Sequence, residues 1–168
     1  RDQIKKFGDH VFQHGSIVIP GNSYSDLTVP YVKINPAFLS NTIDYSIFEN
    51  KIVIGVTNGV KAIVKKALPA TATDPITFYL AYISGGGESS VNVFQPSEEI
   101  YIKDNVSVRA TLVSGTATGI GSMAVINKGV YYVSGSFALV LGQSIVISKY
   151  DSVPSCHVLL KINELIVN

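Results

Sequence analysis

The feature that most constrains this chain is a succession of short β-type segments that starts near Ser16 and continues to the C-terminus. Each segment is rich in Val, Ile, Thr, Tyr and Phe, and breakers containing Gly, Pro, Asn or Ser separate it from the next. Short strands with turn signals every 8–12 residues or so are typical of sandwiches and barrels. We therefore predict an all-β fold, a sandwich or barrel-like domain of about ten short strands. Because no helix alternates with these strands, Rossmann-like and TIM-barrel architectures are excluded.

Two local signals refine this prediction. Thr57-Asn58-Gly59 joins the β-branched runs 51–56 and 60–67, and an Asn-Gly pair in this position predicts a β-hairpin. Pro30 lies within the run 27–34 and lacks an N–H donor, so we expect this run to be an edge strand. The remaining predicted strands cover residues 16–19, 76–83, 99–103, 106–113, 123–127, 130–133, 137–141, 144–148 and 157–167.

Residues 1–15 carry a different pattern. Ile4, Phe7 and Val11 are spaced i, i+3, i+7, which marks one apolar stripe of a helix, and Gly15 supplies a stop. A helix of about fourteen residues is marginal in isolation. We therefore predict that 1–15 form a helical connector, that 16–168 form the β-domain, and that the stripe is an oligomer interface. The start at Arg1, without Met, is interpreted as the start of a piece of a longer polypeptide.

The charge content narrows the class of protein. Charged residues make up 15% of the chain, against about 25% in a typical globular protein. Mean hydropathy is +0.31, yet no apolar run approaches the roughly 18 residues of a membrane helix, so we expect no membrane insertion. Net charge is +1 and the chain has only two arginines, Arg1 and Arg109, which argues against nucleic-acid binding. The low charge predicts that other subunits cover part of the surface.

The histidines and the single cysteine are the first candidates for chemistry. His10 and His14 lie at i, i+4 and could hold zinc, but Val11 stands where a metallohydrolase has its general base. Solvent-facing histidines, or a metal held on an oligomer axis, remain the alternatives. Cys156 precedes His157, and neighbouring strand residues point to opposite faces, so a catalytic pair is disfavoured. We expect the Cys156 thiol to pack into a core.

Two glycine-rich segments and one acidic pair complete the search for an active site. Residues 114–122 contain no lysine, so a phosphate-binding loop is disfavoured and both this segment and 84–90 are interpreted as flexible loops. Glu98 and Glu99 precede a strand, and we expect both to be solvated. The sequence thus nominates no catalytic residue, and we predict a non-enzymatic protein with no cofactor and no metal.

Five tyrosines lie in strand-like runs, although the chain has no Trp. Tyrosine can form sugar-binding platforms, and it also populates cores and interfaces because one end is apolar and the other forms hydrogen bonds. We favour the core or interface interpretation over the sugar platform. The residues concerned are Tyr79, Tyr82, Tyr101, Tyr131 and Tyr132.

Three stretches, 5–18, 128–137 and 147–158, resemble in this order a family of tailed-bacteriophage virion proteins. The first is a helix that ends in Gly15 and enters a β-domain, the second is the glycine-aromatic hairpin Gly129–Phe137, and the third contains Tyr150-Asp151 followed by Pro154. The resemblance implies a structural component of the phage tail, in the baseplate or fibre region of the virion, with no catalytic residues. It also implies a homotrimer whose other partners are tail or baseplate proteins.

Two other functions remain open from the sequence. The first is a receptor- or carbohydrate-binding β-module of a tail fibre that uses loop tyrosines. The second is a hydrolase that uses His10 and His14.

Overall fold

The structure of the chain, a computed structural model, describes residues 17–19, 23–36, 44–84, 93–133, 136–151 and 154–156. Within these ranges the chain forms eleven strands and one short 3-10 helix, so the prediction of an all-β fold is confirmed. The predicted helix 1–15, with Ile4, Phe7 and Val11, lies outside the described residues, as does the predicted strand 157–167.

The strands form two antiparallel sheets. An eight-stranded sheet has the order β11-β8-β2-β5-β4-β3-β6-β7, and a three-stranded sheet has the order β1-β9-β10. The elements are β1 (Ile17–Ile19), β2 (Ser23–Ile34), η2 (Tyr45–Phe48), β3 (Ile52–Gly55), β4 (Lys61–Leu68), β5 (Ile76–Ser84), β6 (Glu99–Ile102), β7 (Asn105–Thr111), β8 (Thr118–Ile126), β9 (Gly129–Val133), β10 (Ser136–Val140) and β11 (Gln143–Ser148).

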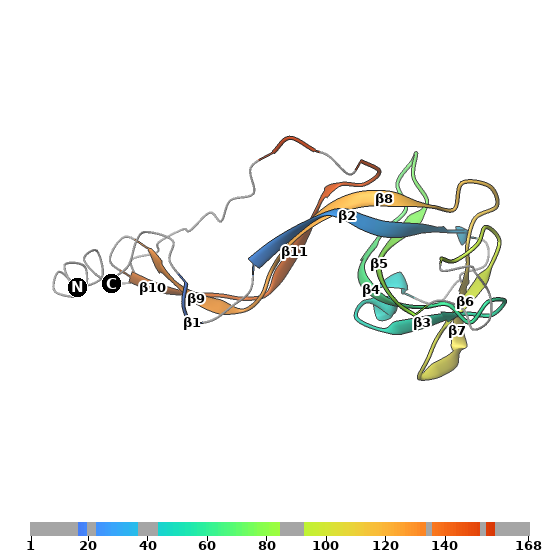
Figure 1. The fold of residues 1–168 in the computed structure, drawn as a ribbon, viewed down its shortest axis with the longest axis horizontal. Coiled ribbons are helices and arrows are strands. Elements are labelled where there is room, and N and C mark those ends of the chain that lie inside the picture. Colours follow the sequence, from blue (N-terminus) through green and yellow to red (C-terminus); the bar gives the residue numbers. More distant parts are fainter. Residues whose placement is uncertain are drawn as a thin grey trace.

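Six strands of the larger sheet close on themselves as a barrel, the rounded part of the molecule in Figure 1. The order β2-β5-β4-β3-β6-β7 returns to β2 through an antiparallel bridge between Ile34 and Leu112. Two further backbone hydrogen bonds support the closure: the Asn35 N–H donates to the Thr111 carbonyl at 2.8 Å, and the Val113 N–H to the Lys33 carbonyl at 3.0 Å. These contacts join the end of β7 to the end of β2 and close the barrel at this point.

The barrel interior holds the main hydrophobic core. Alternate residues of the strands point inward, as the burial pattern of β4 shows with Ala62 and Val64 buried between more exposed lysines. Aromatic rings fill the centre, where Phe48 of η2 lies 5.0 Å from Phe78 of β5 between ring centroids. The other fully buried large side chains of this core are Phe94, Ile34, Leu80, Ile100, Leu112, Val32 and Val53.

A second part of the molecule extends away from the barrel. Strands β2 and β8 run out of it side by side, with β11 paired to β8, and the small sheet β1-β9-β10 lies beyond them (Figure 1). We call β9, β10, β11 and residues 122–126 of β8 the arm.

The predicted hairpin 51–67 is confirmed, with Ile54 opposite Lys61 and Gly59 at φ +66°.

The prediction that Pro30 marks an edge strand is wrong, because β2 lies between β8 and β5. The N–H groups of Lys33 and Asn35 point to the β7–β8 side, at 2.7 and 2.8 Å from their acceptors. Alternation along the strand then places the nitrogen of Pro30 on the β5 side. The pairing of β2 with β5 begins only at Tyr31, so the missing N–H of Pro30 interrupts no bond to β5.

Candidate functional site

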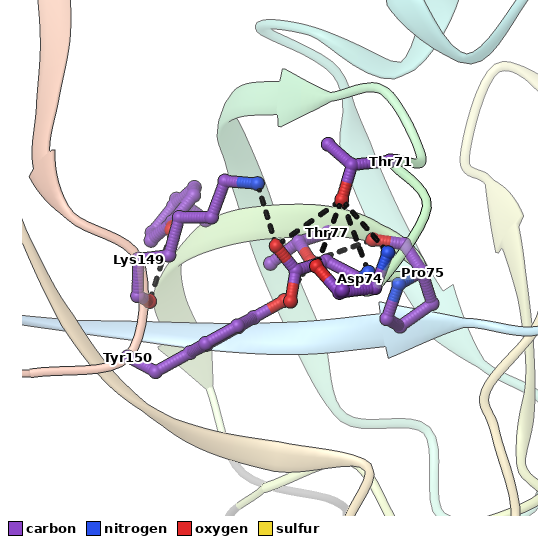
Figure 2. A network of polar contacts seen from close by, with 8 residues as sticks. Thr71, Asp74, Pro75, Thr77, Lys149 and Tyr150 are labelled. Atoms are coloured by element: carbon purple, nitrogen blue, oxygen red, sulfur yellow. Dashed lines mark hydrogen bonds and ion pairs between the residues drawn. The ribbon is translucent and has the colours of Figure 1, made fainter.

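The most elaborate polar cluster holds the chain just after β11 against the barrel (Figure 2). The Tyr79 hydroxyl donates to the Lys149 carbonyl at 3.0 Å, and Lys149 Nζ lies 2.9 Å from Asp74 Oδ2. Asp74 also accepts from the Thr71 hydroxyl at 3.3 Å, within the turn that precedes β5. Asp74 and Lys149 are far apart in the sequence, so this contact fixes where the arm leaves the barrel.

Two glycines of β8 make room for this crossing. A Cβ at Gly121 would lie 2.5 Å from the Lys149 carbonyl oxygen, and one at Gly119 would come closer still to the Tyr31 hydroxyl. Both approaches are shorter than any ordinary carbon contact, so a larger residue would push the crossing chain or the ring away. The interpretation of 114–122 as a loop is therefore wrong for its second half, because residues 118–122 are strand and their glycines serve close packing.

Tyr150 completes the cluster from the same crossing segment. Its hydroxyl lies 3.3 Å from that of Thr77, and its ring centroid lies 5.1 Å from that of Tyr31. The ammonium of Lys33 stands 4.4 Å above the Tyr150 ring, within the range of a cation–π interaction. We call Tyr31, Lys33, Asp74, Tyr79, Lys149 and Tyr150 the clamp.

Three groups of the clamp, Tyr31, Asp74 and Tyr79, have pKa values shifted by their surroundings. Burial raises the pKa of the Tyr79 phenol, and Tyr150 and Tyr31 raise it further, so Tyr79 stays neutral and keeps its proton as a donor. Burial also raises the pKa of Tyr31. The hydrogen bond from Lys149 lowers the pKa of Asp74, which keeps this carboxylate charged and paired. These shifts move all three groups away from proton exchange near neutral pH.

Glu98 differs from the expectation that both members of the acidic pair are solvated. Its side chain is 4% exposed, and its carboxylate accepts from the Gln95 N–H at 2.8 Å and from the Asn58 N–H at 3.3 Å. The loop N–H groups supply the hydrogen bonds that water would otherwise provide, which explains why this carboxylate is buried. Glu99 is exposed and pairs with Arg109, so the two neighbours have unrelated roles.

The structure shows whether most of the singled-out tyrosines and the single cysteine are buried or exposed. Tyr79, Tyr131 and Tyr132 are buried, which confirms the core interpretation for these three. Tyr82 packs against Phe94 with ring centroids 5.5 Å apart. The prediction for Cys156 is wrong, because its thiol is exposed on a stretch outside the described strands, where it meets neither hydrophobic cluster.

Other sequence candidates gain no support from the structure. His10, His14 and His157 lie outside the described residues, as does the glycine run 85–90. Among the described residues there is no group of three or more His, Cys, Asp or Glu side chains placed to hold a metal ion. In the same part of the chain, no helix has the length and apolar character needed to span a membrane.

The arm presents a surface of a different kind. Leu139, Leu141 and Ile145 are exposed to 59%, 62% and 60%, and Phe137 is also exposed. Lys128 is the only charged side chain between Arg109 and Lys149 in the sequence. These exposed apolar side chains make the arm the candidate interaction surface among the described residues.

A cleft lies where the arm meets the barrel. Its volume is about 260 Å³, and it is lined by Glu49, Asn50 and Lys65 from the barrel side and by Asn127, Gln143 and Ser144 from the arm side. Met123, Val125 and Ile126 of β8 contribute apolar lining. The polar groups include donors and acceptors, and the described lining contains no aromatic ring.

Comparisons with protein-family models, with curated proteins and with solved structures find no match to this chain.

Proposed function

We propose that this chain is a non-enzymatic structural component of a phage tail, in the baseplate or fibre region, that assembles as a homotrimer. The observation that carries the proposal is the uncharged, apolar surface of the arm, with Leu139, Leu141 and Ile145 exposed. A permanent subunit contact would remove such a surface from water, and obligate interfaces are more apolar than ordinary protein surface. The clamp and the closed barrel supply rigidity, which a structural part requires.

The assignment to a phage tail draws on the resemblance of residues 5–18, 128–137 and 147–158 to virion proteins. On this assignment the protein belongs to the virion, with other tail or baseplate proteins as partners. The predicted stripe of Ile4, Phe7 and Val11 stays a prediction and would add a second contact between subunits.

The test of assembly is the mass of the purified chain in solution, measured by light scattering after size-exclusion chromatography. We expect the mass of three chains at micromolar concentration. A mass of one chain across the accessible concentration range would contradict the proposed assembly.

The cleft favours a second function, the binding of a carbohydrate receptor. Sugar hydroxyls both donate and accept, and the side-chain amides of Asn127 and Gln143 offer both kinds of group. The volume of about 260 Å³ lies just below that of usual ligand pockets, which suits one sugar ring. A glycan array probed with the wild type and with an Asn127→Ala, Gln143→Ala double variant tests it, because only wild-type binding that the double variant loses supports this function.

A further inference from the structure

We infer that the apolar stripe of β10, formed by Phe137, Leu139 and Leu141, is a contact between neighbouring copies of this chain. The inference rests on the proposed assembly and names its surface and its occupant. These residues alternate along the strand, so Phe137 and Leu139 point to one face, and Leu141 follows directly after the strand. On the opposite face Ala138 and Val140 are half-buried. On the stripe's own face Tyr132 of β9 lies opposite Phe137, is fully buried and packs against its ring with centroids 5.6 Å apart, so the exposed part of this face is its β10 side.

The absence of charge in the arm favours a second copy of this chain as the molecule that covers the stripe. Residues 129–148 contain no Asp, Glu, Lys, Arg or His. A charged partner would find no opposite charge here, whereas two copies bring together surfaces with no like charges to repel each other. Natural outer strands commonly carry lysine or proline that discourages association with another chain, and β10 carries neither.

The exposed apolar residues of the barrel are different, because charges stand next to them. Val106 of β7 is 55% exposed, and it lies between Asp104 and Arg109 in the sequence. Such isolated exposed side chains are normal on a protein surface and indicate no contact. Val106 is therefore a matched control for Leu139, since both are exposed aliphatic residues on β-strands.

The first experiment compares Leu139→Asp with Val106→Asp in the full chain, by size-exclusion chromatography with light scattering and by circular dichroism. We expect Leu139→Asp to keep its β-sheet spectrum and to fall from the mass of the oligomer to that of one chain. We expect Val106→Asp to keep the mass of the wild type. An unchanged mass for both variants overturns the stripe as the contact but leaves the proposed assembly standing, whereas a monomeric wild type overturns both.

The second experiment identifies the occupant directly. A benzophenone amino acid replaces Leu139, and the purified protein is irradiated alone and then together with a virion extract. We expect a covalent dimer in which mass spectrometry finds both linked peptides in this chain, with no dimer when the same group replaces Val106. No dimer from position 139, or linkage in the extract to a different tail protein instead, overturns a second copy as the occupant.

Discussion

Strands β2 and β8 connect the barrel to the arm, but the two regions differ in how they bury their apolar residues. The barrel closes around an aromatic core and carries charged side chains such as Lys61 and Arg109 on its strands. The arm is thin, has almost no charge, and leaves Leu139 and Ile145 largely exposed. Its strand β9 still buries Tyr131 and Tyr132, so the exposed apolar residues lie on and near β10 and β11. The barrel thus encloses its apolar core, whereas the arm leaves several apolar side chains exposed on its described surface.

The largest expected effect comes from shortening one apolar side chain to alanine in each region and comparing the losses in stability. Phe78→Ala removes a fully buried ring that packs on Phe48, and we expect a loss of about 3–5 kcal/mol in the free energy of unfolding. Leu139→Ala should cost less than about 0.5 kcal/mol in dilute, dissociated protein, because its side chain is exposed. Urea denaturation followed by circular dichroism measures both. Equal losses would show that Leu139 is packed as tightly as a residue of the barrel core.

A smaller effect is expected at the junction between the two regions. Gly121→Ala places a Cβ 2.5 Å from the Lys149 carbonyl oxygen, and displacing that backbone should cost roughly 1–3 kcal/mol. Gly142→Ala is the control, since its Cβ would meet its nearest atoms at an ordinary 3.6 Å. Thermal melting compares the two variants. If Gly142→Ala destabilises as much as Gly121→Ala, the crossing segment is held less closely than these contacts require.

The third prediction concerns the buried carboxylate of the barrel. Asn58 and Gln95 donate to different oxygens of Glu98, and Glu98→Gln replaces one of these oxygens with an amide NH₂ that cannot accept. One of the two N–H groups therefore loses its acceptor, and we expect a loss of about 1–2 kcal/mol. Glu99→Gln breaks only an exposed ion pair with Arg109 and should cost less than about 1 kcal/mol. Urea denaturation of both variants at pH 7 measures the difference. Similar losses would mean that burial does not distinguish these neighbours.

The smallest effect is a pH dependence at the clamp. Because Lys149 lowers the pKa of Asp74 in the folded state, the ionised carboxylate stabilises the fold at pH values above the unfolded pKa of about 3.9. This contribution is lost as the pH falls through the lower, folded pKa. We expect Asp74→Asn to melt below the wild type at pH 7 and to approach it under more acidic conditions. A gap that persists unchanged at pH 2 would assign the effect to packing rather than to charge.

Local chemistry explains which parts of the fold are predictable. The hairpin 51–67 follows from Thr57-Asn58-Gly59, because its turn and both strands are contiguous. The position of β2 inside the sheet cannot be predicted from the sequence, because nothing near Pro30 indicates that β8 and β5 will lie on either side of this strand. Gly119 and Gly121 favour a loop in the sequence because glycine weakens an isolated strand. Their role depends on Tyr31 and Lys149, which only the folded chain brings close.

The candidate sites are likewise hard to predict where they depend on contacts between distant segments of the chain. An acidic pair before a strand is usually hydrated. The burial of Glu98 depends on the N–H of Gln95 three residues earlier and on the N–H of Asn58, 40 residues away, and only folding brings Asn58 close. The ion pair of Asp74 with Lys149 likewise joins distant segments. The apolar surface of the arm is closer to what the sequence predicts, because the absence of charge in residues 129–148 is a property of composition and needs no long-range contact.

The continuity of β2 and β8 has a mechanical consequence. Their antiparallel pairing extends from Ser23 opposite Ile126 in the arm to Val32 opposite Thr118 in the barrel. Both backbones cross from the barrel to the arm, so tension along the arm is divided between two covalent chains and passes into the barrel, where β2 pairs with β5. Such a double connection resists stretching along its axis, which suits a part that must stay attached under load.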